Sequence, residues 1–132
     1  MVVREDEAEA RAAAAALIDG LDAAAGDTIR AKSLDATSVG VARQGALRDD
    51  SDDDGYVEPN LWTGIGRARS GCGAAIVGSP AQVEAKLRRY MELGISSFIL
   101  SGYPHQQEAR RFGELVLPRF EHHAIEFSSV DH

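Results

Sequence analysis

Two side chains that can move or stabilise charge stand close together in the segment Ser101-Gly102-Tyr103-Pro104-His105. A tyrosine hydroxyl donates a hydrogen bond to developing negative charge, and a histidine near neutrality can accept or release a proton. Tyr103 and His105 are therefore candidates for stabilising an oxyanion. A structural role explains the same residues equally well, with Tyr103 packed on a neighbouring loop and His105 capping the next helix. Their spacing does not decide between these interpretations.

A second candidate is the segment 60–73, in which four glycines flank Arg67 and Arg69. Glycines permit large backbone excursions, and a guanidinium can close on a sulfonate or phosphate through paired hydrogen bonds. The alternative is a solvated basic loop that balances the acidic residues upstream. A dinucleotide-binding loop is set aside, because Gly64-Ile65-Gly66 neither follows a predicted strand nor opens a predicted helix.

The elements that position the first candidate loop are predicted by strong local patterns. The apolar run 74–77 ends at a glycine, and Ser79-Pro80-Ala81-Gln82 combines an N-cap, a proline at the first helical position and a capping-box glutamine. We expect a helix over 80–93 that stops at Gly94. Phe98-Ile99-Leu100 is apolar on consecutive residues, which predicts a strand over 95–100 that is buried on both faces of a parallel sheet.

The loop 101–105 would therefore leave the carboxyl end of a strand and lead into a helix over 106–117, which Pro118 ends. This order of strand, helix, strand and helix is typical of an open α/β sheet or of a TIM barrel. In a barrel, such loops build the active site. The last stretch, 120–132, shows no clear periodicity and is expected to be a tail.

The first half of the chain is helical by its pattern. Alanine-rich residues 5–25 carry one apolar stripe, and a second helix is predicted from Asp27 to about residue 47. The acidic run 48–55 reads as a solvated linker, since crowded carboxylates repel one another. A calcium loop is disfavoured because the ligand spacing is missing. The expected organisation is a helical segment 1–47, a linker and mobile loop 48–73, a βαβα part 74–119 and the tail.

Composition narrows the choice of function. The chain has 132 residues, about half of the roughly 250 that a TIM barrel needs, so a barrel reading is partial. A net charge of -7 without a basic stripe disfavours nucleic acid as a partner. The sequence contains no long apolar window and opens without a signal-like segment, which predicts a cytoplasmic protein that does not enter membranes. The single cysteine, Cys72, is interpreted as a small filler residue.

Three stretches of the sequence carry a family resemblance: Asn60-Leu61-Trp62-Thr63-Gly64-Ile65-Gly66, Ile99-Leu100-Ser101-Gly102-Tyr103-Pro104-His105, and Phe112-Gly113-Glu114-Leu115 behind them. They closely resemble the C-terminal region of alkanesulfonate monooxygenases that use reduced FMN. These enzymes belong to the luciferase-like family. The similarity covers the chain strongly from Pro59 to Pro118 and more loosely before that. It implies the C-terminal fragment of a TIM barrel, hence an α/β fold. It also implies an enzyme that uses reduced FMN and O2 to convert an alkanesulfonate to an aldehyde and sulfite, with an NAD(P)H-dependent flavin reductase as partner.

The resemblance also implies roles for individual residues. Arg69 matches the arginine of the family's mobile loop, and Tyr103 and His105 match the tyrosine and histidine beside the flavin and the sulfonate. Arg67 inherits no role, and Cys72 is not the family's active-site cysteine. The remaining site residues of the family come from earlier strands outside this chain, so independent catalysis is not expected. No metal is implied.

Two other functions fit the same sequence. A noncatalytic barrel remnant would act by association, either with a chain that completes the barrel or with a second copy through exposed strand edges. A small anion-binding module would use Arg67 and Arg69. Both alternatives stay open at the level of sequence.

Overall fold

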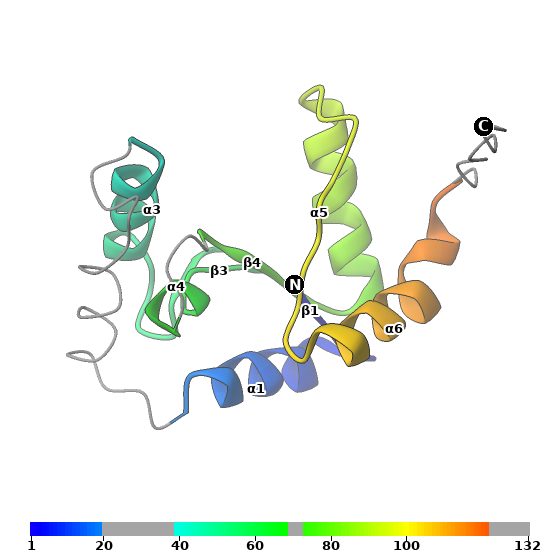
Figure 1. Ribbon diagram of the computed structural model, residues 1–132, viewed down its shortest axis with the longest axis horizontal. Coiled ribbons are helices and arrows are strands. Elements are labelled where there is room, and N and C mark those ends of the chain that lie inside the picture. The colour runs from blue at the N-terminus through cyan, green and yellow to red at the C-terminus, as the bar shows by residue number, and fades with distance from the viewer. Residues whose placement is uncertain (20–38, 69–72, 122–132) are drawn as a thin grey trace, which may run out of the picture.

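The computed structural model describes residues 1–19, 39–68 and 73–121, which form an α/β arrangement around one small mixed sheet (Figure 1). The strands stand in the order β1-β4-β3-β2. β1 runs parallel to β4, whereas β3 is antiparallel to both of its neighbours. The strand bounds are Val2–Val3 for β1, Tyr56–Glu58 for β2, Leu61–Trp62 for β3 and Ala75–Gly78 for β4.

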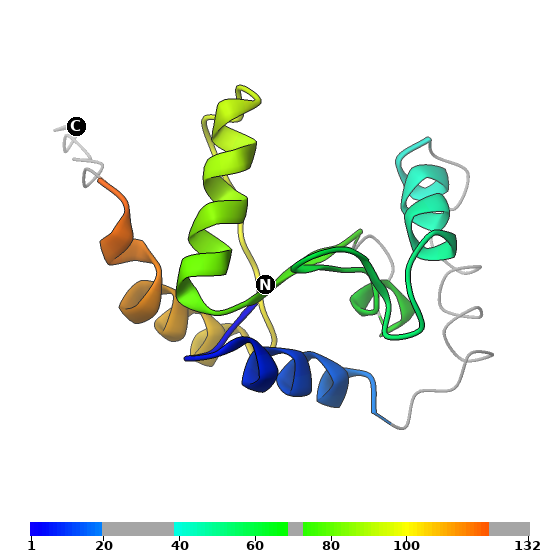
Figure 2. The ribbon, with the colours of Figure 1, turned by 180° about the vertical axis from the view of Figure 1, so that it is seen from behind.

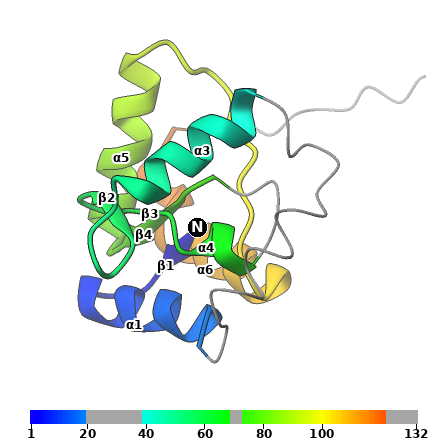
Figure 3. The same cartoon turned by 90° about the vertical axis from the view of Figure 1, so that its left-hand side faces the viewer.

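The two faces of the sheet are buried under different helices. Successive side chains in a strand point to opposite faces, and Val2 and Val77 accordingly pack with helix α1, while Val3 and Ile76 pack on the other face with helices α5 and α6. Figure 3 shows α1 below the strands and α5 above them. The alternation divides the core into two apolar clusters, and Tyr103 packs against the first of them.

Helix α1 (Glu7–Leu17) begins where the Asp6 carboxylate accepts a hydrogen bond from the backbone N–H of Glu9 at 2.9 Å. Its alanines bring it close to the sheet, and Ala10 and Ala14 are fully buried. The predicted helix over 5–25 is confirmed from Glu7 to Leu17, but it ends earlier than predicted, with Ile18 as its C-cap, and residues 20–25 lie outside the described residues. Helix α3 (Val39–Asp49) confirms the later part of the second predicted helix, whose start is not described.

Helix α5 (Pro80–Glu92) confirms the strongest local prediction. The Ser79 side chain and Gln82 form a reciprocal capping box, and Gly94 leaves the helix with a φ of 94°. Val83 and Leu87 are buried against the sheet. Each contributes about 1.5–3 kcal/mol by removing its side chain from water. Helix α6 (His105–Leu115) and the short 3-10 helix η1 (Leu117–Arg119) follow, close to the predicted span.

The predicted strand over 95–100 is wrong for this structure. Residues 95–100 form no regular secondary structure, and the yellow chain in Figures 1 and 2 runs beside α5 without joining a strand. Ile99 is fully exposed, and Phe98 and Leu100 are 36% and 37% exposed, so none of the three is buried as a central strand requires. The physical reason is the pairing around the central strand: β4 already pairs with β1 on one edge and with β3 on the other, and toward the outer edge of β1 the chain is held by the hydrogen bond from the Met1 ammonium to the Ser101 carbonyl oxygen and not by a strand ladder. An apolar run becomes a strand only when a neighbour offers hydrogen bonds.

The predicted acidic linker and mobile loop over 48–73 also needs correction. Its middle forms the β2–β3 hairpin and the short helix α4 (Ile65–Ala68). Asp52 accepts hydrogen bonds from the backbone N–H groups of Asp54 and Tyr56, at 3.0 and 2.8 Å, so the carboxylates shape a tight turn. Ile65 therefore does follow a strand and open a helix, contrary to the prediction. Strand β1 was not predicted, because two residues are too few to show a period.

Within the described ranges, no helix combines the length and apolar character required to cross a membrane. In those same ranges, no group of three or more histidine, cysteine, aspartate or glutamate side chains could hold a metal ion. Most of the expected tail, residues 122–132, lies outside the description.

Candidate functional site

The loop 101–105 brings both aromatic candidates together. The ring centroids of Tyr103 and His105 lie 4.6 Å apart with an interplanar angle of 47°. Pro104 occupies the N-cap position of α6 and makes no side-chain cap, so His105 is the first helical residue and does not cap the helix. Its ring is exposed, while Tyr103 is half-buried against the core. A fixed hydrogen-bond donor and an accessible proton carrier therefore stand side by side.

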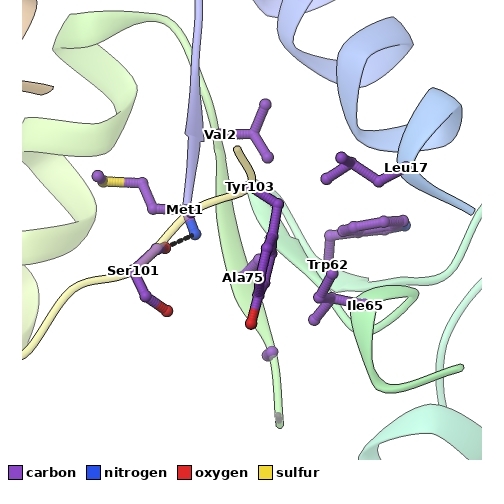
Figure 4. A pocket seen from close by; sticks show the side chains of 10 residues that line it. Met1, Val2, Leu17, Trp62, Ile65, Ala75, Ser101 and Tyr103 are labelled. Atoms are coloured by element: carbon purple, nitrogen blue, oxygen red, sulfur yellow. Dashed lines mark hydrogen bonds between the residues drawn. The ribbon is translucent and has the colours of Figure 1, made fainter. Parts of the chain in front are cut away.

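Tyr103 forms a wall of a hollow of about 210 Å³. Figure 4 shows Leu17, Trp62 and Ile65 on one side of the tyrosine ring and Met1 and Ser101 on the other. The surroundings are mostly apolar, which is typical of a pocket that binds an aromatic group with a few polar contacts for orientation. The tyrosine oxygen is buried within these surroundings.

Trp62 is held firmly at this hollow. Its indole N–H donates to the Asp54 carbonyl oxygen at 3.1 Å, and its ring is 2% exposed. A Cβ on Gly64 would lie 2.3 Å from the indole carbons, so only glycine fits at that position. Thr63 adds a hydrogen bond from its hydroxyl to the Gly55 carbonyl oxygen at 2.9 Å. The sequence placed Trp62 in a mobile loop and missed it as a site residue; its pairing with Ala75 of β4 depends on the tertiary fold.

A second hollow of about 260 Å³ opens on the His105 side of the loop. Its walls include Leu100, Phe112 and the buried Glu108 of α6. The two hollows share Met1, Ser101 and Gly102, so the loop backbone separates them. The two candidate rings therefore line different hollows on either side of one short segment.

Glu108 is the most buried charged side chain among the described residues, with 1% exposure. Arg4 contacts both of its carboxylate oxygens, at 2.9 and 3.1 Å, and Arg111 contacts one at 2.7 Å. Arg4 also donates to the Val3 carbonyl oxygen at 2.7 Å, which fixes its guanidinium on β1. Sequence reasoning missed Glu108, since a single glutamate in an amphipathic helix reads as exposed.

The third predicted residue, Arg69, lies outside the described residues, and so does Cys72. Helix α4 ends at Ala68, directly before Arg69, and Ile65 of the same helix lines the first hollow. Arg67 is exposed on α4. The rings of Tyr103 and His105 thus lie next to each other. Ile65, four residues before Arg69 in the sequence, lies at the first hollow.

Behind the first hollow, burial raises the pKa of the Tyr56 hydroxyl. The guanidinium of Arg11, whose carbon stands 3.9 Å from the ring centroid, opposes this effect. Tyr56 and Trp62 face each other across β2 and β3 and belong to the same buried cluster. The hairpin wall of the hollow is therefore apolar and uncharged at neutral pH.

Comparison with known proteins gives the class of protein. The chain is 64% identical over 122 residues to a sulfoquinovose monooxygenase of Novosphingobium aromaticivorans, covering 92% of this chain and 34% of that protein. It is 55% identical over 121 residues to a sulfoquinovose monooxygenase of Agrobacterium fabrum, covering 92% of this chain and 31% of the relative. The chain thus spans about one third of the length of these curated relatives. No family model matches the sequence.

These alignments and the α/β fold identify the chain as homologous to part of a monooxygenase. Its homologues are monooxygenases, and the chain aligns with about one third of each of them, as expected for a fragment of a larger enzyme. The family resemblance seen in the sequence is thereby confirmed. Both relatives are named for sulfoquinovose, whereas the sequence motifs suggested an alkanesulfonate.

Proposed function

We propose that this chain forms the C-terminal part of a flavin-dependent monooxygenase that releases sulfite from sulfoquinovose, a sulfonated sugar. The observation that carries the proposal is the 64% identity to a sulfoquinovose monooxygenase across nearly the whole chain. At the level of the fold, the chain would supply the last strands and helices of a TIM barrel. A cytoplasmic location remains a prediction from the sequence.

In this proposal each predicted site residue has a distinct task. Arg69 closes on the sulfonate, because a planar guanidinium binds two of its oxygens at once. The Tyr103 hydroxyl donates a hydrogen bond where negative charge develops, and the apolar walls around it strengthen that bond by excluding water. His105, exposed at the start of α6, transfers a proton. The ring centroids lie 4.6 Å apart although the rings line different hollows, so the proposal requires a bound molecule that reaches both sides of the loop.

Reduced FMN is the proposed co-substrate, and it supplies the electrons with which O2 is activated. The fit of this chain to a flavin is partial: the hollow beside Tyr103 holds about 210 Å³, and ligand pockets hold roughly 300–1,000 Å³. Trp62, Ile65 and Tyr103 offer an apolar wall for one face of an aromatic ring system. The other walls would come from the part of the relatives that this chain does not span. A flavin reductase is the proposed source of the reduced flavin.

A chimera tests the proposal. The aligned C-terminal third of the Novosphingobium relative is replaced by this chain, and sulfite release is measured with reduced FMN and either sulfoquinovose or a simple alkanesulfonate. We expect turnover of sulfoquinovose. Preference for the alkanesulfonate would support the substrate class that the sequence motifs suggested. A folded chimera that releases sulfite from neither would refute the proposed function.

A second candidate function is association without catalysis, and the exposed segment 95–100 favours it. Ile95, Phe98, Ile99 and Leu100 present an apolar surface next to Leu93 and Met91 of the α5 end. Such a surface on a soluble domain is a site for a partner. Analytical ultracentrifugation of the 132-residue chain would show whether it pairs with itself. A concentration-independent monomer would remove self-association, and binding to the separately produced remainder of the relative would support completion of the barrel.

A further inference from the structure

We propose that Glu108 is a positioning residue for the site loop, acting through Gly102 on Tyr103 and His105. The inference rests on the proposed function only in taking Tyr103 and His105 as site residues. Glu108 itself lines the hollow on the His105 side and lies in the first turn of α6. What distinguishes it is that two distant parts of the fold, the residue after β1 and the site loop, both contact it.

The first contact ties the helix to the sheet. Arg4 follows β1, donates to the Val3 carbonyl oxygen, and holds both carboxylate oxygens of Glu108 in a forked arrangement at 2.9 and 3.1 Å. Forked pairs fix direction as well as distance. Since Arg4 is 104 positions away in sequence, this pair sets where the start of α6 lies relative to β1. Arg111, at 2.7 Å, holds the same carboxylate from within the helix.

The second contact links Glu108 to the loop backbone. A Cβ built on Gly102 would lie 2.5 Å from the Glu108 Cβ and 2.8 Å from its Cγ, so the loop rests directly on the glutamate stem. The same Cβ would lie 2.9 Å from the Met1 carbonyl oxygen. Gly102 is thus enclosed between β1 and α6. Any shift of the Glu108 side chain displaces Gly102, and Tyr103 is the next residue.

A purely structural ion pair would stabilise α6 without controlling the loop, and the experiment must separate the two roles. Nuclear magnetic resonance of the full 132-residue chain gives that readout, because Tyr103 and His105 have ring centroids 4.6 Å apart and exchange magnetisation. The variant is Glu108→Gln, which keeps the volume but turns an amide N–H₂ toward a guanidinium. The matched control is Glu114→Gln, an exposed glutamate on the same helix. Thermal unfolding of every variant is recorded in parallel.

We expect Glu108→Gln to shift the ring resonances of Tyr103 and His105 and to weaken the cross-peak between them, with Glu114→Gln matching the unmodified chain. Arg4→Lys should give an intermediate shift and Arg4→Gln a full one, since lysine restores the charge without the fork. Wild-type resonances in Glu108→Gln with a lowered unfolding midpoint would overturn the proposal. If Glu108→Gln does not fold, unchanged rings in Arg4→Gln would overturn it equally. None of these outcomes depends on flavin, sulfonate or turnover, so the proposed function is judged separately.

Discussion

Two apolar stretches of similar composition have opposite fates in this molecule. Ala75-Ile76-Val77 becomes the central strand β4, buried on both faces and paired on both edges. Phe98-Ile99-Leu100 stays irregular and exposed, six to eight residues after the end of α5. The difference lies in the neighbours: β4 pairs with β1 and β3, whereas segment 95–100 pairs with no described strand, and the next residue, Ser101, meets the start of β1 through one hydrogen bond from the Met1 ammonium at 2.7 Å. An apolar run favours burial of its side chains, but it becomes a β-strand only where neighbouring strands offer backbone hydrogen bonds.

The largest expected effect contrasts the two stretches with one substitution. Ile76→Ala, at 8% exposure, should lower the free energy of unfolding by about 2–5 kcal/mol, because a cavity opens between β4 and the helices. Ile99→Ala, at a fully exposed position, should change it by less than about 0.5 kcal/mol. Urea denaturation of both variants measures this. A comparable loss in Ile99→Ala would mean that segment 95–100 is packed in solution.

The next prediction concerns the loop that joins the exposed segment to α6. Gly102→Ala places a methyl group against Glu108 and the Met1 carbonyl, so we expect a loss of about 1–3 kcal/mol in unfolding free energy. Gly113→Ala is the matched control, since nothing lies within 4 Å of its Cβ position in α6. That change should stabilise the helix by about 0.5–1 kcal/mol. Equal effects in denaturant melts would show that the loop does not rest on Glu108.

The sequence predicts the features of this fold that depend on neighbouring residues, and it misses those that depend on contacts between distant parts of the chain. The capping box at Ser79 and the stop at Gly94 depend on residues a few positions apart, and both are present as predicted. The hairpin at residues 56–62 was missed, because its acidic flank resembles a linker and its stability comes from Trp62 packing under α1 and β4. Glu108 was missed for the same reason, since Arg4 lies at the other end of the chain. Tyr103 and His105 could be singled out only because they share one short loop.

The hairpin can also be tested by alkaline titration. Burial raises the pKa of Tyr56 above its value in the unfolded chain, so the folded state favours the neutral phenol. The stabilisation is complete below the unfolded pKa of 10.0 and is lost as pH rises through the folded value. As the pH is raised from neutral to above the pKa of the folded tyrosine, the free energy of unfolding should therefore fall less in Tyr56→Phe than in the unmodified chain. Parallel losses in the two proteins would indicate a solvated hydroxyl.

The smallest effect is expected on the outer side of α5. Hydrogen bonds from Arg88 and Arg119 lower the pKa of the partly exposed Glu84 carboxyl. This contribution is present above the unfolded pKa of 4.5 and disappears as pH falls through the lowered folded value. Glu84→Gln should slightly reduce the acid sensitivity of unfolding, and high salt should cancel the difference because the carboxylate is solvated. A salt-independent difference would point to a buried pair instead.

In the proposed function, Arg69, Tyr103 and His105 belong to one sulfonate site that this chain would share with the rest of a luciferase-like barrel. The most direct measurement is kcat/KM for sulfite release from sulfoquinovose by the chimera, with each residue changed in turn. We predict that His105→Ala and Arg69→Ala each reduce it by about 10²-fold or more, Tyr103→Phe by a smaller factor, and Arg110→Ala, an exposed arginine of α6, by almost nothing. An active chimera in which all four variants keep full activity would contradict the claim.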